Sequence, residues 1–186
     1  IIKSIKKEKK ILYLGTRKKS QINPGIPIDQ IKNILKNNKF QLIIRPHPKV
    51  SRDKDLYERA ISFYKEKLSY NSSYLPIKFS NPYQRELLID FIQSCGVISD
   101  NCSAYRFAIL LDLPVFETTG LMKHFDMPSD NNKLFGFSNK IDNKQWQLFI
   151  NECRLTMNKK DINYYKIFED EKNKLDKAFS EILNLN

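Results

Sequence analysis

The sequence predicts an α/β protein with a Rossmann-like, doubly wound parallel sheet of five to six strands, helices on both faces and a C-terminal helical extension. Short apolar runs alternate with segments of helical periodicity along most of the chain. In the run over 40–46, Phe40, Leu42, Ile43 and Ile44 are apolar with little alternation, which is typical of a strand covered on both faces. A length of 186 residues suits one domain with its own core.

The first half of the chain supplies three strands and two helices. The strands read KILYLGT, FQLIIRP and LPIKFS, at 10–16, 40–46 and 75–80. A Pro-, Gly- and Asn-rich loop and a helix near 28–38 separate the first two strands, and a polar helix over 52–68 follows the second. This strand–helix–strand order favours parallel pairing.

The second half continues the pattern. NPYQRELLIDFIQSC predicts a helix over 82–95, which Gly96 ends, and GVISD is a very short strand. A helix then spaces Ala104, Phe107, Ala108 and Leu111 on one face and ends before Pro114. PVFETT is the next strand, a long loop covers 120–133, and LFGF is an edge strand. Two helices, at 143–157 and 161–184, close the chain; Trp146, Phe149, Ile150 and Cys153 form the apolar face of the first.

We expect three parts: a basic linker over 1–8, a Rossmann-like nucleotide-binding domain over 9–142, and helices over 143–186 packed on that domain. The cysteines, Cys95, Cys102 and Cys153, form no C-x-x-C pair, and their odd number argues against a disulfide framework. They predict a reducing, cytoplasmic setting. No window approaches the roughly 18 apolar residues that a membrane-spanning helix needs.

The net charge is +11, from 32 basic and 21 acidic residues. No helix-turn-helix, zinc-finger or RNP pattern accompanies this charge, so nucleic acid is not an expected partner. A Lys-rich solvated surface is the preferred interpretation, with an affinity for anionic polymers or for the inner face of the plasma membrane.

The segment LIIRPHPKV places Arg45, His47 and Lys49 at the carboxyl end of the second strand. Pro46 and Pro48 restrict the backbone on both sides of the histidine and stiffen this tip. A rigid imidazole beside a guanidinium suits an anionic ligand. The alternative is that His47 only caps a turn and bonds to backbone.

A second group of polar residues, SDNCS, follows the fourth strand. Ser99, Asp100, Asn101 and Ser103 stand where a helix begins, and hydroxyls with backbone N–H groups favour phosphate there. Ordinary N-capping explains any one of these residues equally well.

A third group, Glu117, Thr118 and Thr119, ends the fifth strand at the same sheet edge. A carboxylate at this place can accept hydrogen bonds from ribose hydroxyls, and a loop cap is the alternative. His124, in the long loop, is a weaker candidate for a lid residue. The sequence has no G-x-G-x-x-G, no Walker A motif, no nucleophile elbow and no metal-ligand spacing.

The pair RPHP and SDNCSAYRFAILLDLPVFE resembles the donor-binding half of GT-B transferases of the HP-motif type. These are the CDP-glycerol glycerophosphotransferases and, more distantly, the bacterial sialyltransferases and polysialyltransferases. The resemblance covers roughly residues 9–120. The matching positions are Arg45, His47, Pro48, Ser99, Asp100, Ser103, Phe107 through Leu111, Pro114 and Val115. The chain departs from the pattern at Cys102 and at Asp112–Leu113, where serine and a Gly/Asn-Lys pair are common.

The resemblance implies that His47 contacts the donor phosphate or assists departure of the leaving group, while Ser103 and neighbouring N–H groups hold the phosphates. No metal or other cofactor is then required. The expected donor is a CDP- or CMP-activated sugar or alditol rather than a UDP-sugar, and the expected product is a cell-surface polysaccharide such as capsule or teichoic acid. The glycan acceptor and the catalytic base would belong to an N-terminal domain absent from this chain, so we expect it to be inactive alone.

Two alternatives remain open. One is a UDP-sugar 2-epimerase-like domain, against which the absence of a D-S-G-G turn after the fourth strand counts. The other is a non-catalytic module that binds an anionic glycan or acts as a scaffold, to which the charge of +11 would be suited. His47 and Ser103 at one sheet edge favour the transferase.

Overall fold

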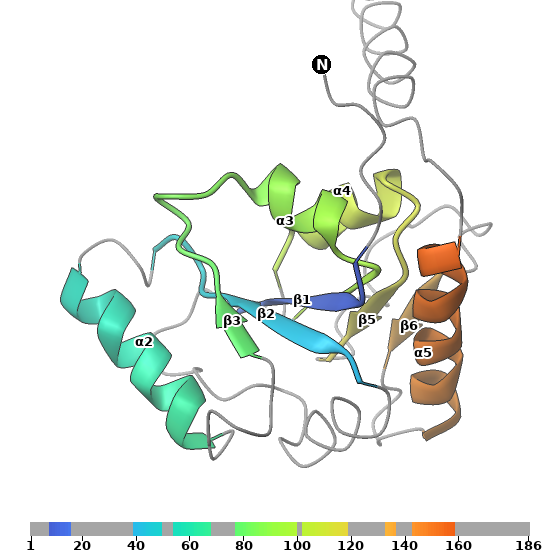
Figure 1. Ribbon diagram of the computed structural model, residues 1–186, viewed down its shortest axis with the longest axis horizontal. Coiled ribbons are helices and arrows are strands. Elements are labelled where there is room, and N and C mark those ends of the chain that lie inside the picture. The colour runs from blue at the N-terminus through green and yellow to red at the C-terminus, as the bar shows by residue number, and fades with distance from the viewer. Residues whose placement is uncertain are drawn as a thin grey trace, which may run out of the picture.

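The structure, a computed structural model, describes residues 8–15, 39–49, 54–67, 77–99, 102–118, 133–136 and 143–158. These residues form a six-stranded sheet and four helices (Figure 1). The strands are β1 (Lys10–Leu14), β2 (Gln41–Arg45), β3 (Ile77–Phe79), β4 (Gly96–Ser99), β5 (Val115–Glu117) and β6 (Leu134–Gly136). The helices are α2 (Lys54–Lys67), α3 (Leu87–Gln93), α4 (Tyr105–Leu110) and α5 (Asn143–Asn158).

The strand order is β3-β2-β1-β4-β5-β6, and every neighbouring pair is parallel. The chain builds the sheet outward from β1 through β2 to β3, and then from β4 through β5 to β6. The order therefore reverses between β1 and β4, as it does in doubly wound folds. The predicted Rossmann-like α/β class is confirmed.

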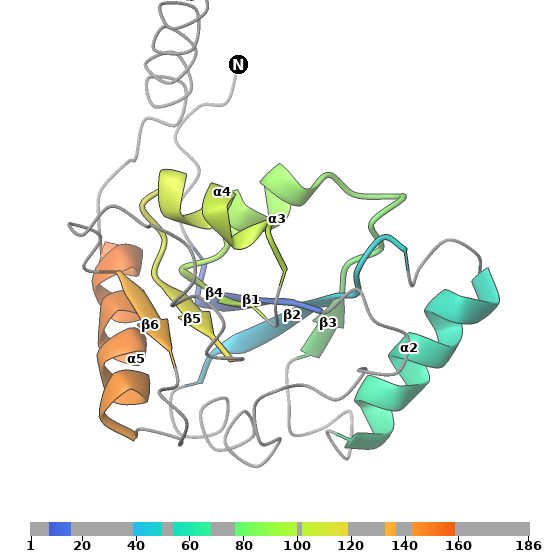
Figure 2. The same ribbon diagram turned by 180° about the vertical axis from the view of Figure 1, so that it is seen from behind.

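One face of the sheet is covered by α3 and α4 (Figures 1 and 2). Leu12 and Leu14 of β1 point to this face, where they join Phe91 of α3 and Ala108 of α4 in one buried cluster. The cluster also contains Ile43, Ile92, Val97, Tyr105, Leu111, Leu113 and Val115.

The opposite face packs against α2 and α5 (Figures 1 and 2). Ile11 and Tyr13 alternate with the leucines of β1, so their side chains reach this second cluster. Phe116 of β5 meets Trp146 of α5 edge to face, with 4.5 Å between ring centroids. Because both faces are apolar, the central strands β1 and β2 contain continuous runs of buried residues, whereas β3 alternates around an exposed Lys78.

Every predicted strand exists, with shorter bounds, and α2 and α5 lie close to their predicted ranges. The predicted helix over 82–95 is shorter, because residues 81–86 form turns instead. The Asn81 side chain accepts the Tyr83 N–H at 2.9 Å, an alternative to helical bonding that Asn favours. Helix α3 begins only after Glu86, whose backbone is extended.

One detail of the second half was predicted wrongly. Phe107 was assigned to the apolar face of its helix, but it is 56% exposed, whereas Ala108 and Leu111 of that predicted face are buried. Gly96 begins β4, as the predicted strand GVISD requires, while the helix that it was expected to end already stops at Gln93. Its lack of a side chain serves packing, since a Cβ there would lie 2.3 Å from Cys153 Sγ of α5.

Several predicted segments lie outside the described residues. These are the helices near 28–38 and 161–184, the loop over 120–132 and most of the basic linker. The proposed division into three parts stays a prediction. Among the described helices, none is both long enough and apolar enough to cross a membrane.

Candidate site at the carboxyl edge of the sheet

The candidate site lies where the strand order reverses. In doubly wound sheets, ligands bind beyond the carboxyl ends of the strands at this point. The described groups here are Gly15 after β1, the segment Arg45–Lys49 at the end of β2, Ser99 at the end of β4, and Glu117 and Thr118 at the end of β5. Gly15 donates its N–H to the Arg45 carbonyl at 3.1 Å, which ties the ends of β1 and β2 together.

A side chain at the Gly15 position would require the Tyr64 hydroxyl to move. An added Cβ would lie 2.9 Å from the Tyr64 hydroxyl oxygen and 3.6 Å from Pro46 Cα. Glycine therefore lets β1 end close to α2 and to the proline that follows β2.

The guanidinium of Arg45 is held by hydrogen bonds to other groups of the protein. Its Nη1 donates to Asp90 Oδ2 at 2.7 Å and to Ser80 Oγ at 2.9 Å, and its Nη2 donates to the Arg85 carbonyl at 2.8 Å. Asp90 is fully buried and also pairs with Arg85. These bonds satisfy two charges that would be costly to bury alone. In the structure, the hydrogen bonds of Arg45 link the end of β2 to Ser80, to the Arg85 carbonyl and to Asp90 of α3. The predicted contact of Arg45 with a ligand stays a prediction.

The charge of Arg45 also reaches α2. Partial burial raises the pKa of the Tyr57 hydroxyl above its ordinary value, and the nearby guanidinium opposes this rise.

His47 lies half-buried at the tip that follows Arg45. Its Nδ1 accepts the backbone N–H of Lys49 at 3.0 Å, so the imidazole closes a turn, as the more modest interpretation of the sequence proposed. With Nδ1 accepting, the neutral ring carries its proton on Nε2. Pro48 and Lys49 are exposed at the same tip. The turn fixes both the orientation of His47 and its tautomer.

Two residues at this edge were missed by the sequence reasoning. Tyr83, in the turns before α3, donates its hydroxyl to the Pro48 carbonyl at 2.9 Å. Asp90 anchors Arg45 from α3. A signal for Asp90 was present, since an acid inside the apolar run LLIDFI needs a buried partner. Nothing in the sequence marks Tyr83.

Ser99 closes the turn between β4 and α4. Its Oγ donates to the Cys102 carbonyl at 3.2 Å and accepts the Cys102 N–H at 3.4 Å. These bonds close a turn ahead of α4, whose N-cap residue is Ala104 and has no side-chain cap bond, so the structure does not give Ser99 the N-capping role that was the alternative for the SDNCS group. Ser103 is exposed in the same turn, while Asp100 and Asn101 lie outside the described residues.

Helix α4 offers fewer backbone donors than expected. The N–H groups of Tyr105, Arg106 and Phe107 donate to the carbonyls of residues 102–104, at 3.1 to 3.2 Å. The expected phosphate contact in this turn therefore depends on Ser103 and the residues just before it, rather than on the first turn of α4.

Glu117 and Thr118 are both buried at the end of β5. Glu117 pairs in register with Ser99, and the Thr118 N–H donates to the Ser99 carbonyl at 3.1 Å. The structure thus places the ends of β4 and β5 side by side, as predicted. Thr119 and His124 lie outside the described residues.

Among the described residues, no three His, Cys, Asp or Glu side chains group together as a metal site requires.

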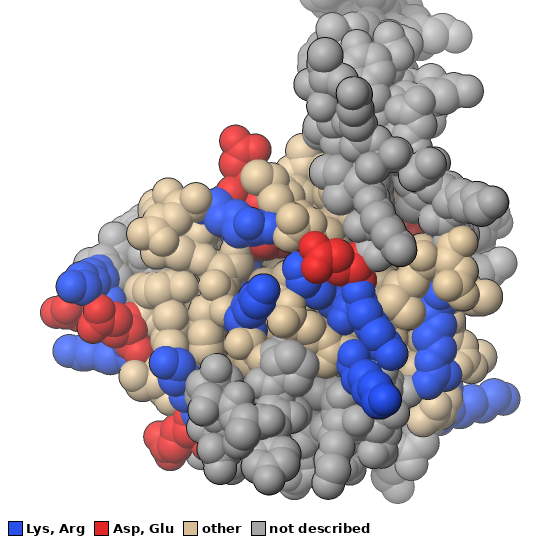
Figure 3. Space-filling model, in the orientation of Figure 1, with Lys and Arg blue, Asp and Glu red and all other residues tan. Residues whose placement is uncertain are grey.

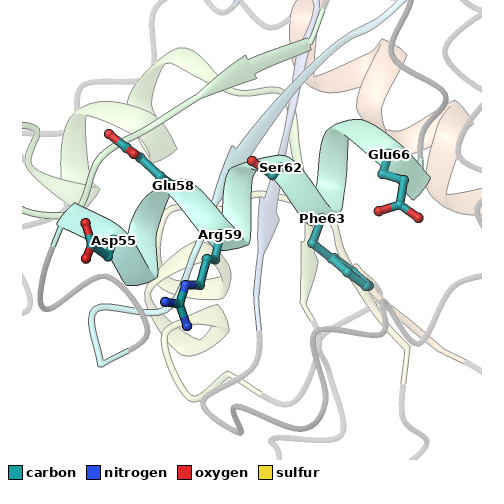
Figure 4. A pocket seen from close by; sticks show the side chains of 6 residues that line it. All are labelled: Asp55, Glu58, Arg59, Ser62, Phe63 and Glu66. Atoms are coloured by element: carbon teal, nitrogen blue, oxygen red, sulfur yellow. The ribbon is translucent and has the colours of Figure 1, made fainter.

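A shallow hollow of about 480 Å³ runs along α2 (Figure 4). The described residues that line it are Asp55, Glu58, Arg59, Ser62, Phe63 and Glu66. None of these is a predicted site residue.

The space-filling view shows many Lys and Arg side chains spread over the face seen in Figure 3, interrupted by a few acidic ones.

Compared with models of protein families, with curated proteins and with solved structures, the chain matches none. The site is therefore interpreted from its own geometry.

Proposed function

We propose that the chain binds the nucleotide of an activated sugar or alditol at the carboxyl edge of its sheet, as the donor half of a transferase that builds a cell-surface polysaccharide. The observation that carries the proposal is the strand reversal between β1 and β4. The His47 turn follows β2, the neighbour of β1, and the bonds of Ser99 with Cys102 follow β4, so the two groups lie on either side of this reversal. Doubly wound sheets bind nucleotides at this place.

The chemistry of the two turns suits a diphosphate. With Nδ1 accepting the Lys49 N–H, a neutral His47 ring would carry its proton on Nε2, and Ser103 has an exposed hydroxyl; both groups would then donate to phosphate oxygens. Donors fixed before the ligand arrives stabilise the charge that develops on a departing nucleotide. Lys49, exposed at the tip beside His47, adds a positive charge.

The resemblance to HP-motif transferases supports a cytidine nucleotide as the leaving group. It also assigns the acceptor site and the catalytic base to a second domain. The isolated chain is then expected to bind CDP or CMP without turning over a donor. His47 would stabilise the leaving group, because its turn fixes it as a donor at Nε2 rather than as a base.

The proposal is tested by calorimetric titration of the chain with CDP, CMP and UDP. Saturable binding of a cytidine nucleotide that His47→Ala and Ser103→Ala each weaken about tenfold supports it. Lys144→Ala, at an exposed lysine of α5, is the control for nonspecific attraction and should bind as the wild type does. Binding of UDP alone would move the proposal to another donor class.

The second candidate is a non-catalytic module for an anionic glycan, which the basic surface in Figure 3 favours. Such binding would be sensitive to salt and insensitive to His47→Ala. If no nucleotide binds and a carboxylated polysaccharide does, this candidate replaces the first.

A further inference from the structure

The His47 turn is held by contacts from α3 and from the segment between β3 and α3. Before the turn, Arg45 is tied to Asp90, Ser80 and the Arg85 carbonyl. Within the turn, the Tyr83 hydroxyl donates to the Pro48 carbonyl at 2.9 Å. The two contacts hold Arg45 and Pro48, which lie on either side of His47 in the sequence.

Tyr83 has little to gain from packing. Its side chain is 60% exposed, yet 35 positions separate it from the carbonyl that it contacts. The Asn81 side chain accepts the Tyr83 N–H at 2.9 Å, which orients the backbone of the tyrosine. An exposed side chain held at both ends contributes to local geometry more than to the core.

We propose that Tyr83 is a positioning residue for His47: its hydroxyl fixes the Pro48 carbonyl, and with it the turn in which Lys49 N–H bonds to His47 Nδ1. This inference deepens the proposed function and rests on it as far as ligand affinity is concerned. Tyr83 acts through His47 and need not touch the nucleotide.

The test compares Tyr83→Phe, which removes the hydroxyl and keeps the ring, with Tyr83→Leu, which removes both. Tyr105→Phe is the matched control, because it deletes a buried hydroxyl that has no hydrogen-bond partner among the described contacts. Each of the three variants is prepared with ¹⁵N labelling, and the signals of the Lys49 amide and the His47 ring nitrogens are followed by NMR.

Tyr83→Phe is expected to move the Lys49 amide resonance and the His47 ring-nitrogen shifts, to weaken CDP binding about fivefold, and to leave the melting temperature within the range of the control. Tyr83→Leu should have the same effects. Unchanged Lys49 and His47 signals in Tyr83→Phe would overturn the inference. So would a normal affinity in Tyr83→Phe together with a lost affinity in Tyr83→Leu, because the ring would then be a direct contact.

Failure of the proposed function is distinguishable from failure of this inference. If the wild-type chain binds no nucleotide, the proposed function fails, while the NMR signals of Lys49 and His47 still decide the role of Tyr83. Asp90→Asn tests the contact between Arg45 and Asp90 by the same NMR signals. Because that variant alters a buried ion pair and could unfold the chain, the exposed Tyr83 carries the decision.

Discussion

Arg45 and Asp90 form a buried ion pair, with 2.7 Å between Nη1 and Oδ2, that joins the end of β2 to α3. Arg45 lies two residues before His47, so the pair is next to the turn that carries His47. Its position means that the candidate site and the stability of the fold share a residue.

Removal of one member of this pair should be costly. Asp90→Ala leaves the Arg45 guanidinium buried without its carboxylate, and we expect the free energy of unfolding to fall by about 3–5 kcal/mol. Urea unfolding followed by circular dichroism measures the loss. Glu58→Ala is the control, because its pair with Lys54 is exposed and spans 3.9 Å; it should cost a few tenths of a kcal/mol. Equal losses in the two variants would contradict a buried structural role.

A second prediction concerns the contact between β4 and α5. Gly96→Ala would place a Cβ 2.3 Å from Cys153 Sγ, so we expect a destabilisation of about 1–3 kcal/mol. Cys153→Ala in the same chain removes the sulfur and should recover part of this loss. Gly136→Ala is the control, since the nearest atom to its new Cβ, the Glu117 carbonyl oxygen, is 3.4 Å away. A double variant no more stable than Gly96→Ala alone would contradict the packing.

Stability should also depend on pH through Cys153. Burial, helped by a hydrogen bond with Cys95, raises the pKa of the Cys153 thiol well above its usual value. A raised pKa in the folded state stabilises the fold below the unfolded pKa of about 8.5, and this contribution is lost as the pH rises further. Unfolding free energies of wild type and Cys153→Ala, measured from pH 7 to pH 10, should therefore converge. Parallel curves would show that the Cys153 thiol does not contribute to the pH dependence of stability.

The three cysteines should differ in reactivity. Cys95 and Cys153 are buried, whereas Cys102 is partly exposed in the turn that Ser99 closes. We expect iodoacetamide to modify Cys102 first, as measured by peptide mass spectrometry. A bound nucleotide should slow this reaction, since Cys102 lies in the proposed phosphate turn. Unchanged labelling in saturating CDP, at a concentration where calorimetry shows binding, would place the nucleotide elsewhere.

The class of fold could be predicted because parallel strands covered on both faces leave a plain signal. In β1, Ile11 and Tyr13 reach one core cluster while Leu12 and Leu14 reach the other, so four consecutive residues of the strand are apolar. Helix bounds were harder to predict, because turn bonds of side chains compete with helix formation. Asn81 illustrates this, since its side-chain bond belongs to the turns that delay α3.

The gathering of the candidate residues at one sheet edge could be predicted from the sequence, but the partners of their side chains could not. Strand ends collect at one edge of a parallel sheet, which brings Arg45, Ser99 and Glu117 to the same side. Whether Arg45 faces a ligand or a carboxylate depends on Asp90, which is 45 positions away. Contacts over such separations are set by the packing of α3 on the sheet, and no local pattern records them.

The central claim is that a nucleotide binds at the carboxyl edge between β1 and β4. The most direct measurement is a titration of the ¹⁵N-labelled chain with CDP, followed by amide chemical shifts. We predict the largest shifts at residues 45–49 and 99–103, with smaller ones at 117–118, and their loss in His47→Ala. No shifts in these segments, or shifts confined to the hollow along α2, would contradict the claim.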